Sequence, residues 1–395
     1  MKCVVVGAGA WGLPAAAELA GRGHEVVLVD RHGIANPLSS SPGPTRLWRL
    51  THPDAVRVRL AQRSVEAMER LASRSGRTVH LRRGLLWRDD VSLPAVRAAL
   101  DEVGVGHRVV AAADVATLFR GLRPDGRDAV WQEDAGPVLA AESMAAQAGL
   151  LAAAGGTVRT GQVVVDVRTT SGGVRLSFDD GSALDADVVV LAPGPGAAPL
   201  LEMVGLSIPL GPHLEQVVHF GEPSGGTATD DLPCLFDGPR LDGPRLDGHG
   251  PDGRDGVEPG LYAMPTPGRG YKVGLDRPLR DYVEGDLDRT PDEAVVAATR
   301  DRVARDLTGV PARVLDAQVC SWTDSPDRRF IIDTLPGGVV VACGDSGEGF
   351  KFSALMGIVL ADLAEGQAPD PDVATFGAGR FAASAEPAGK HVLGR

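Results

Sequence analysis

Residues 2–12 have the sequence KCVVVGAGAWG, an apolar run followed by glycines at the spacing G-x-G-x-x-G. The apolar run predicts a buried strand, and residues 13–20 after the glycines have the pattern of a helix. A second apolar run, residues 25–29, ends at Asp30. Strand, glycine turn, helix, strand and acid in this order are typical of a βαβ unit that binds a dinucleotide.

Each glycine of this motif has a separate physical role. Gly7 permits the tight turn, Gly9 lets the backbone approach a pyrophosphate, and Gly12 lets the helix pack closely on the strand. The unpaired N–H groups at the start of the helix favour a phosphate. Asp30 can accept a hydrogen bond from a ribose hydroxyl. The motif leaves FAD and NAD open as the dinucleotide.

The composition excludes several classes of protein. The chain has 395 residues, 43% of them hydrophobic, and a formal net charge of −12. The length favours two domains, and the acidic balance argues against nucleic acid or an anionic membrane as a partner. No apolar run is long enough to cross a bilayer and no signal-peptide pattern is present, so we expect a cytoplasmic protein. Four scattered cysteines fit neither a disulfide scaffold nor a zinc site.

Lysine is rare in this chain. Only four of the 40 basic residues are lysine, namely Lys2, Lys272, Lys351 and Lys390. Because arginine is used in place of lysine almost throughout this chain, an interior lysine is expected where a compact charge with a tunable pKa is needed and a planar guanidinium does not serve. Lys272 and Lys351 are therefore candidates for functional cations, with solvated surface positions as the alternative.

The rest of the chain alternates predicted helices and short strands. Helices are expected at 56–73, 92–103, 111–119, 143–154 and 291–306, the last with Thr290 as its cap. Strands at 157–159, 163–169, 174–178 and 188–191, separated by turn residues, predict an antiparallel meander. A strand at 339–343, a glycine loop at 344–349 and a helix at 352–365 indicate that the chain returns to the nucleotide domain.

Residues 221–260 differ in composition from the rest of the chain. They contain the duplication DGPRL at 237–241 and 242–246, followed by further Asp-Gly pairs. Such a segment cannot bury a core, so we expect a mobile surface loop. Asp-Gly turns could also supply oxygens to calcium, but the spacing matches no known calcium loop.

Several motifs occur in one order along the chain: the fingerprint at 7–12, TRLWR at 45–49, GYKVG at 270–274, CSWTD at 320–324 with RFIID at 329–333, and GDSGEGFKF at 344–352. With this ordered set the chain resembles the D-amino-acid-oxidase superfamily of FAD enzymes, and most closely the branch of monomeric sarcosine oxidase, N-methyltryptophan oxidase and pipecolate oxidase. The match covers nearly the whole chain apart from 221–260.

The resemblance implies an α/β (α+β) fold with two interleaved domains. One is a glutathione-reductase-like FAD-binding Rossmann domain, expected at 1–80, 140–210 and 318–395. The other is a mostly antiparallel β-sheet substrate domain, expected at 81–139 and 211–317, with the mobile loop at 221–260.

The resemblance also implies a reaction, namely oxidation of a C–N bond to an imine with O₂ reduced to H₂O₂. Cys320 stands where the family bonds FAD covalently, Lys272 where it activates oxygen, and Arg49 and Lys351 where it holds the substrate carboxylate. General chemistry agrees with these roles. A fixed cation stabilises negative charge that develops on O₂, a guanidinium offers two hydrogen bonds to a carboxylate, and a cysteine becomes a good nucleophile if nearby charge lowers its pKa.

Thr45 and Arg46 match residues that line the flavin in the family. The predicted cofactor-binding residues are Gly7, Gly9, Trp11, Gly12, Asp30, Arg31, Thr45, Arg46, Val163, Cys320, Gly347, Gly349 and Lys351. The predicted catalytic residues are Lys272, Arg49, Lys351, Asp276 and Trp322.

Three positions depart from the sarcosine-oxidase pattern and make sarcosine itself doubtful as the substrate. Asp276 and Glu348 stand where sarcosine oxidase has histidines, and Trp322 stands where it has a tyrosine. Trp48 and Asp276 are more similar to the imino-acid oxidase of nikkomycin biosynthesis, which aromatises a cyclic substrate. An anionic Asp276 could accept a hydrogen bond from a substrate N–H, with a surface turn as the alternative.

The leading hypothesis is an FAD-dependent amine oxidase that acts on a secondary or cyclic α-amino or imino acid and O₂. We expect a monomer, without nucleic acid, membrane or metal as partner. The alternatives are a flavin-dependent amino-acid dehydrogenase that passes electrons to a partner, a non-catalytic flavoprotein subunit, and an NAD-only dehydrogenase. Structural alternatives also stand for single residues: a plain buried cysteine for Cys320, a phosphate or surface contact for Arg49, and a loop cap for Lys351.

Overall fold

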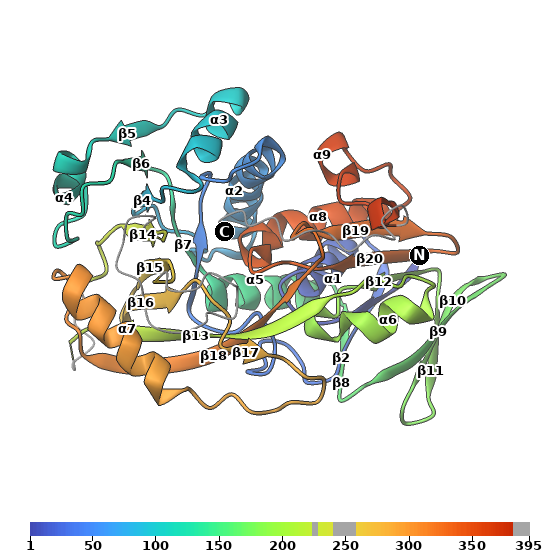
Figure 1. Ribbon diagram of the computed structural model, residues 1–395. Helices are drawn as coiled ribbons and strands as arrows, with labels where there is room; N and C mark the ends of the chain where they lie inside the picture. The colour runs from blue at the N-terminus through green and yellow to red at the C-terminus, as the bar shows by residue number, and fades with distance from the viewer. Residues whose placement is uncertain (223–227, 240–257, 382–395) are drawn as a thin grey trace.

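The computed structural model describes residues 1–222, 228–239 and 258–381. One half of the molecule, formed by segments from both ends of the chain, is built around a six-stranded sheet (Figure 1). The strands in spatial order are β19 (Ile331–Leu335), β20 (Val339–Cys343), β12 (Val188–Leu191), β1 (Lys2–Val6), β2 (Glu25–Asp30) and β8 (Thr157–Thr160). All neighbours run parallel except β19, which is antiparallel to β20.

Both faces of this sheet are covered, which explains why β1 is apolar without interruption after Lys2. Cys3 and Val5 face a helical layer, and Val4 and Val6 face a small antiparallel sheet. The helical layer consists of α1 (Gly12–Gly21), α2 (Ala55–Ser75), α5 (Ala140–Ala153) and α8 (Ser353–Ala364). The small sheet consists of β9 (Val164–Thr170), β10 (Gly173–Phe178) and β11 (Ala183–Ala186), beside α6 (Ala197–Met203). Within the described ranges, no helix has the length and apolar composition to span a membrane.

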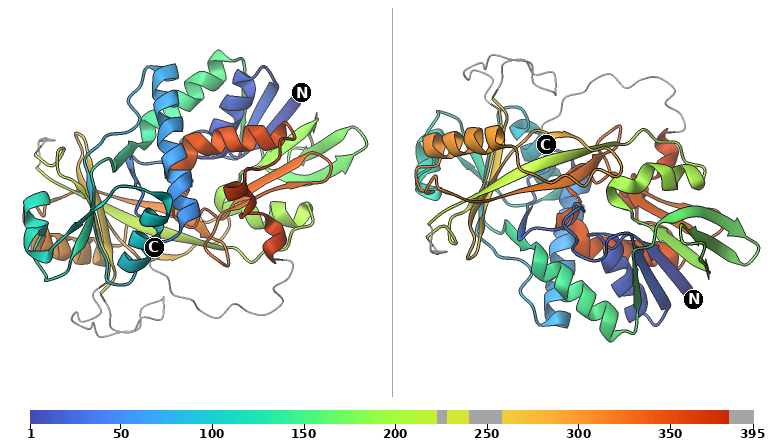
Figure 2. Two further views of the ribbon diagram at one scale, coloured as in Figure 1. Left: turned by 90° about the horizontal axis from the view of Figure 1, so that it is seen from above. Right: turned by 90° about the horizontal axis from the view of Figure 1, so that it is seen from below.

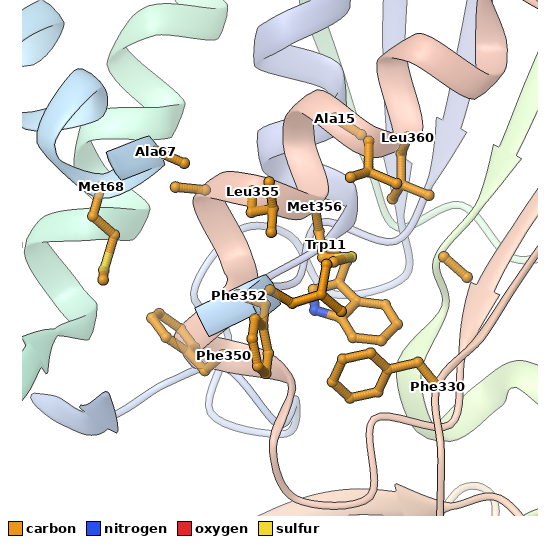
Figure 3. Packing of buried hydrophobic residues seen from close by; sticks show 14 of the residues in the cluster. Trp11, Ala15, Ala67, Met68, Phe330, Phe350, Phe352, Leu355, Met356 and Leu360 are labelled. Carbon is orange, nitrogen blue, oxygen red and sulfur yellow. The ribbon is translucent and has the colours of Figure 1, made fainter. Parts of the chain in front are cut away.

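Aromatic side chains join the two glycine loops within the helical layer (Figure 3). Trp11, at the start of α1, packs edge-on against Phe330 with ring centroids 5.1 Å apart. Phe330 in turn packs against Phe352, just before α8, at 5.4 Å. The Trp11 indole Nε1 donates a hydrogen bond to the Gly349 carbonyl at 3.0 Å. The N-terminal glycine turn is thus tied to a loop more than 300 residues later.

The other half of the molecule is built around a nine-stranded, mostly antiparallel sheet. Its strands are β17 (Arg280–Asp281), β13 (Gly211–Phe220), β16 (Gly270–Leu275), β15 (Leu261–Thr266), β14 (Cys234–Asp237), β4 (Leu85–Arg88), β6 (Ala129–Gln132) and β5 (Arg108–Val110), with β18 (Val314–Asp324) paired to β13. The helices α3 (Leu93–Val103), α4 (Val115–Leu118) and α7 (Glu293–Asp306) lie beside it. The long pair β13 and β18 extends from this sheet toward the six-stranded one (Figure 2).

Short elements complete the described chain. The two-stranded antiparallel sheet of β3 (Thr45–Trp48) and β7 (Gly136–Leu139) connects the two halves through contacts with β15 and α5. The remaining short helices are η1 (Ala112–Asp114), η2 (Gly194–Gly196), η3 (Gly349–Phe352), α9 (Pro371–Ala374) and η4 (Ala378–Phe381).

The predicted α/β fold is present, but three local predictions are wrong. The strands β8 and β12 do not belong to the meander; they pair in parallel within the six-stranded sheet, and β11 takes the third place in the meander. Periodicity indicates that a segment is a strand but not which sheet it joins. The cap of α7 is Asp292, whose carboxylate accepts from the N–H groups of Ala294 and Val295, rather than Thr290.

The surface-loop prediction for 221–260 is wrong for its middle part. Cys234–Asp237 forms β14, which is buried and pairs with β15 on one side and β4 on the other. Residues 223–227 and 240–257, which include most of the DGPRL duplication and the calcium alternative, lie outside the described residues.

Candidate active site

A cavity of about 520 Å³ lies where the two halves meet. One side is formed by residues at the carboxyl ends of parallel strands, namely Gly7 after β1, Asp30 at the end of β2 and Gly344 after β20. The other side is formed by the nine-stranded sheet, with Lys272 on β16 and Cys320 on β18. In α/β sheets, the crevice at the carboxyl ends of the strands is the usual place for a nucleotide.

The nucleotide end of the cavity depends on close backbone approach. Gly7 has φ +103°, and a Cβ there would lie 2.2 Å from the Ala192 carbonyl oxygen. A Cβ on Gly12 would lie 1.9 Å from the Gly7 oxygen. The Asp30 carboxylate accepts from the Ala8 N–H at 2.7 Å through one oxygen and from two N–H groups of the following turn through the other. Asp30 therefore holds both turns in place beside the cavity.

We expect Gly12→Ala to abolish FAD binding and to destabilise the protein by about 3 kcal/mol, because the new Cβ would displace the turn backbone. Gly149→Ala is the matched control, since its Cβ would meet nothing within 4 Å and alanine stabilises a helix by roughly 0.5–1 kcal/mol relative to glycine. Flavin absorbance per mole of protein and the urea midpoint measure both effects. Normal FAD content in Gly12→Ala would contradict the close-packing argument.

A carboxylate, a tyrosine and a cysteine meet on the sheet side of the cavity. Glu215 on β13 is directly opposite Cys320 on β18 in the strand register. The Tyr262 hydroxyl donates a hydrogen bond to the Glu215 carboxylate. The Tyr262 ring lies across β16 because Gly274 on that strand has no Cβ. A Cβ at Gly274 would lie only 2.3 Å from the Tyr262 ring carbon Cζ. All three side chains line the cavity.

Burial raises the pKa of the Cys320 thiol, and the nearby Arg46 and Lys272 offset this only in part. The condition under which a cysteine becomes a good nucleophile, a pKa lowered by nearby charge, is therefore not met in this arrangement. The thiolate of Cys320 loses more solvation on burial than the two cations return.

Lys272 is buried on the central strand β16, with only 3% of its surface exposed. Its ammonium donates a hydrogen bond to the Thr45 carbonyl. Burial, reinforced by the nearby Arg46, lowers the pKa of Lys272 to about 7. The surface alternative for this lysine is thereby excluded, and its charge changes near neutral pH.

A second group of charges surrounds Glu348 in the C-terminal glycine loop. Arg49 Nη2 donates to Glu348 Oε1 at 2.6 Å, and Lys351 Nζ lies 3.5 Å from the same oxygen. Arg57 Nε lies 3.2 Å from Glu348 Oε2. His52 Nδ1 lies 3.6 Å from Oε1, and burial beside Arg49 lowers the His52 pKa well below its usual value. One partly buried carboxylate thus faces three basic side chains and a neutral imidazole.

These contacts change what Arg49 can offer a ligand. Its Nη1 donates to the Thr51 carbonyl and lies 3.2 Å from His52 Nδ1, while Nη2 is bonded to Glu348. The guanidinium also lies 4.5 Å from the centre of the Trp87 ring. Both terminal nitrogens of Arg49 therefore already have partners within the chain. In contrast to what the sequence predicts, the guanidinium is not open in this arrangement to bind a carboxylate through two hydrogen bonds.

Asp276 and Trp322 also line the cavity. Asp276 is half-buried and follows β16, where its backbone N–H donates to the Gly260 carbonyl at 2.7 Å. Trp322 is buried on β18 and donates from Nε1 to the Asp324 carboxylate at 3.1 Å. Trp48, in contrast, packs into the core, where Nε1 donates to the Ala61 carbonyl and to Ser64.

The structure brings most of the predicted site residues together at this one cavity. Those in its lining are Gly7, Gly9, Trp11, Asp30, Arg46, Arg49, Lys272, Asp276, Cys320, Trp322, Gly347, Gly349 and Lys351. Four predicted residues lie outside the lining: Gly12, Arg31, Thr45 and Val163. Arg31 forms an ion pair with Glu284 at 3.1 Å, and Thr45 reaches the site through its carbonyl contact with Lys272.

Sequence reasoning missed Glu215 and Tyr262 in the lining and Arg57 and His52 around Glu348. His52 and Arg57 follow the TRLWR motif closely in the sequence, and this was the one signal that could have drawn attention to them. Glu215 and Tyr262 carry no local signal, since their proximity depends on strand pairing.

A dinucleotide crevice that faces an antiparallel sheet with a buried lysine, and a second buried lysine on the C-terminal loop, fit the class of flavin-dependent oxidoreductases that the resemblance implies. The chain belongs to the FAD dependent oxidoreductase family, whose sequence model matches residues 2–363. The resemblance found in the sequence is thereby confirmed, and so is the expectation of an FAD-dependent enzyme.

Known relatives span the whole chain. The monomeric sarcosine oxidase of Streptomyces avermitilis is 27% identical over 372 residues, which cover 91% of this chain and 92% of that protein. Among solved structures, NikD, an unusual amino acid oxidase essential for nikkomycin biosynthesis, aligns with a TM-score of 0.80 and 25% identity over 95% of this chain and 96% of that one. The L-proline dehydrogenase of P. horikoshii shares the fold, with a TM-score of 0.79 at 19% identity over 96% of this chain and 97% of that one.

Proposed function

We propose that this protein is an FAD-dependent amine oxidase that oxidises the C–N bond of a secondary or cyclic α-amino or imino acid to an imine and reduces O₂ to H₂O₂. The observation that carries the proposal is the convergence of Lys272, Cys320, Arg49 and Lys351 on one cavity that begins at the dinucleotide turn. The relatives that span the chain include oxidases of amino acids.

The residues of the nucleotide crevice fit FAD. The glycine turn leaves no room for a Cβ at Gly7, α1 directs its first N–H groups toward a phosphate, and Asp30 lies at the end of β2 in the cavity lining. When bound, the flavin would supply the acceptance of a hydride from substrate and the passage of its two electrons to O₂, which takes up two protons to become H₂O₂. Gly347 and Gly349 would hold the flavin from the C-terminal loop, and Cys320 would attach it covalently.

The other residues of the cavity bind and orient the substrate. Arg49 and Lys351 attract its carboxylate. Asp276 accepts a hydrogen bond from the substrate N–H and so directs the C–H bond next to nitrogen toward the flavin. Trp322 and the neighbouring apolar side chains exclude water from the reacting atoms. Lys272, on the opposite wall, stabilises the negative charge that O₂ acquires as it is reduced.

The experiment that tests this proposal first is acid denaturation of the purified holoenzyme. We expect the yellow colour to stay with the polypeptide and the peptide that contains Cys320 to carry the mass of FAD. In Cys320→Ala the colour is expected to appear in the supernatant, because the cavity-lining cysteine on β18 is gone. Cys234→Ala is the control, since Cys234 is buried on β14 outside the lining. Peroxide formation with secondary and cyclic amino acids then tests the activity.

A second candidate, a flavin-dependent dehydrogenase that passes electrons to a partner, is supported by one observation. Lys272 has a pKa of about 7, so a substantial fraction of the enzyme lacks the oxygen-activating charge at neutral pH. The dehydrogenase predicts rapid anaerobic reduction by substrate and slow reoxidation in air. The oxidase predicts fast reoxidation, measured by stopped-flow absorbance.

A further inference from the structure

The cations that would bind the substrate carboxylate already share a carboxylate of the chain. Glu348 Oε1 lies 2.6 Å from Arg49 Nη2 and 3.5 Å from Lys351 Nζ. The Glu348 side chain is 13% exposed and lines the cavity. Arg49 and Lys351 also line the cavity, so the position of Glu348 is the position that an incoming carboxylate would have to share.

The charges around Glu348 make it a permanent anion. Lys351, Arg49 and Arg57 together hold the pKa of its carboxyl well below the usual value, although burial opposes this. Lys351, for its part, has a pKa lowered to about 7 by burial. Because His52 is held neutral, the subsite contains two guanidiniums, one partly charged ammonium and one fixed carboxylate. Its capacity to attract a second carboxylate is correspondingly reduced.

We propose that Glu348 is a specificity-determining residue that competes with the substrate carboxylate for Arg49 and Lys351. The inference rests on the proposed function, because it assigns the cations to the substrate carboxylate. A small amino acid, for which the carboxylate supplies most of the binding energy, is disfavoured by this competition. The enzyme selects a larger cyclic or aromatic amino acid whose ring gains binding energy on the apolar part of the cavity.

The cavity supplies such an apolar surface. Its lining includes side chains from the nine-stranded sheet, from β3 and from the C-terminal loop: Phe236, Met264, Trp322, Leu47 and Phe350. Apolar contact adds binding energy in proportion to the area removed from water. A ring can therefore compensate for a weakened carboxylate contact, whereas a methyl group cannot.

The test measures binding without turnover. FAD-loaded enzyme is titrated with cyclopentanecarboxylate, which has a ring and a carboxylate but no C–N bond to oxidise, and with the neutral cyclopentanecarboxamide. Flavin absorbance reports binding. In Glu348→Gln we expect the carboxylate to bind at least roughly tenfold tighter, because the competing anion is removed, while the carboxamide changes less than about threefold. Weaker or unchanged carboxylate binding would show that Glu348 organises the cations instead of competing with the ligand.

Asp54→Asn is the matched control. Asp54 pairs with the opposite side of Arg57 at 3.1 Å but lies outside the cavity lining, and asparagine keeps its helix-capping ability. We expect carboxylate binding within about twofold of the unmodified enzyme. An equal gain in Asp54→Asn and Glu348→Gln would overturn the inference, because any nearby charge would then have the same effect.

A measurement on the unmodified holoenzyme keeps the inference testable if Glu348→Gln does not fold. The carboxylate is expected to bind at most about tenfold tighter than the carboxamide, whereas an open arginine–lysine pair gives roughly a hundredfold or more. Carboxylate binding roughly a hundredfold or more tighter than carboxamide binding would overturn the inference. Tightening in Glu348→Gln without reduction of the flavin by any secondary or cyclic amino acid would instead count against the proposed function and leave the competition intact.

Discussion

Replacing Lys272 with methionine is expected to slow the reaction of the reduced holoenzyme with O₂ by ~10²–10³, the loss typical of removing one charge-stabilising group. Methionine keeps the length of the side chain and removes only the ammonium that lies buried on β16. Anaerobic reduction by the amino-acid substrate is expected to stay within about threefold, because the role proposed for Lys272 belongs to the reaction with O₂. Stopped-flow absorbance of enzyme reduced by light and EDTA measures the oxygen step alone.

The pH dependence of the same step provides an internal check. The pKa of Lys272 is about 7, below the ordinary lysine value, so the side chain is charged below pH 7 and neutral above it. Reoxidation of the unmodified enzyme should therefore become slower as the pH rises from about 6 to 8. The rate in Lys272→Met should be flat over this range. Lys351→Met is the matched control, since it removes the other buried lysine of the cavity and should weaken substrate binding rather than reoxidation.

Replacing Arg49 with glutamine is expected to lower kcat/KM for the amino-acid substrate by ~10²–10³, because one partner of a buried charged contact is lost. We also expect a loss of about 3 kcal/mol in the free energy of unfolding, the lower end of the penalty for breaking a buried ion pair. The loss is limited because Arg57 and Lys351 still face Glu348. Steady-state kinetics and urea unfolding measure the two effects.

Two further variants separate binding from stability. Arg57→Gln also removes a cation from Glu348, but Arg57 is not in the cavity lining, so kcat/KM should stay within about fivefold. The double variant Arg49→Gln with Glu348→Gln removes both charges and should recover part of the stability without recovering substrate binding. Full recovery of kcat/KM in the double variant would show that Arg49 serves only to neutralise Glu348.

The sequence by itself determined the nucleotide half and the family. The strand, the glycine turn and the acid at Asp30 are neighbours in the chain, and their geometry depends on local sterics such as the absence of a Cβ at Gly7 and Gly12. The motif around Lys351 and the strand that carries Lys272 could likewise be read from short segments, since spacing and residue type are local properties.

Only the tertiary structure decided which side chains meet. Strand pairing places Glu215 opposite Cys320, and it assigns β8 and β12 to the parallel sheet instead of the meander. The direction of the Cys320 pKa shift depends on burial, which the sequence does not contain. The contact of Glu348 with Arg49 joins residues 299 positions apart. A charge is visible in the sequence, but its partner and its solvation are set by packing, and these decide how strongly the site attracts a carboxylate.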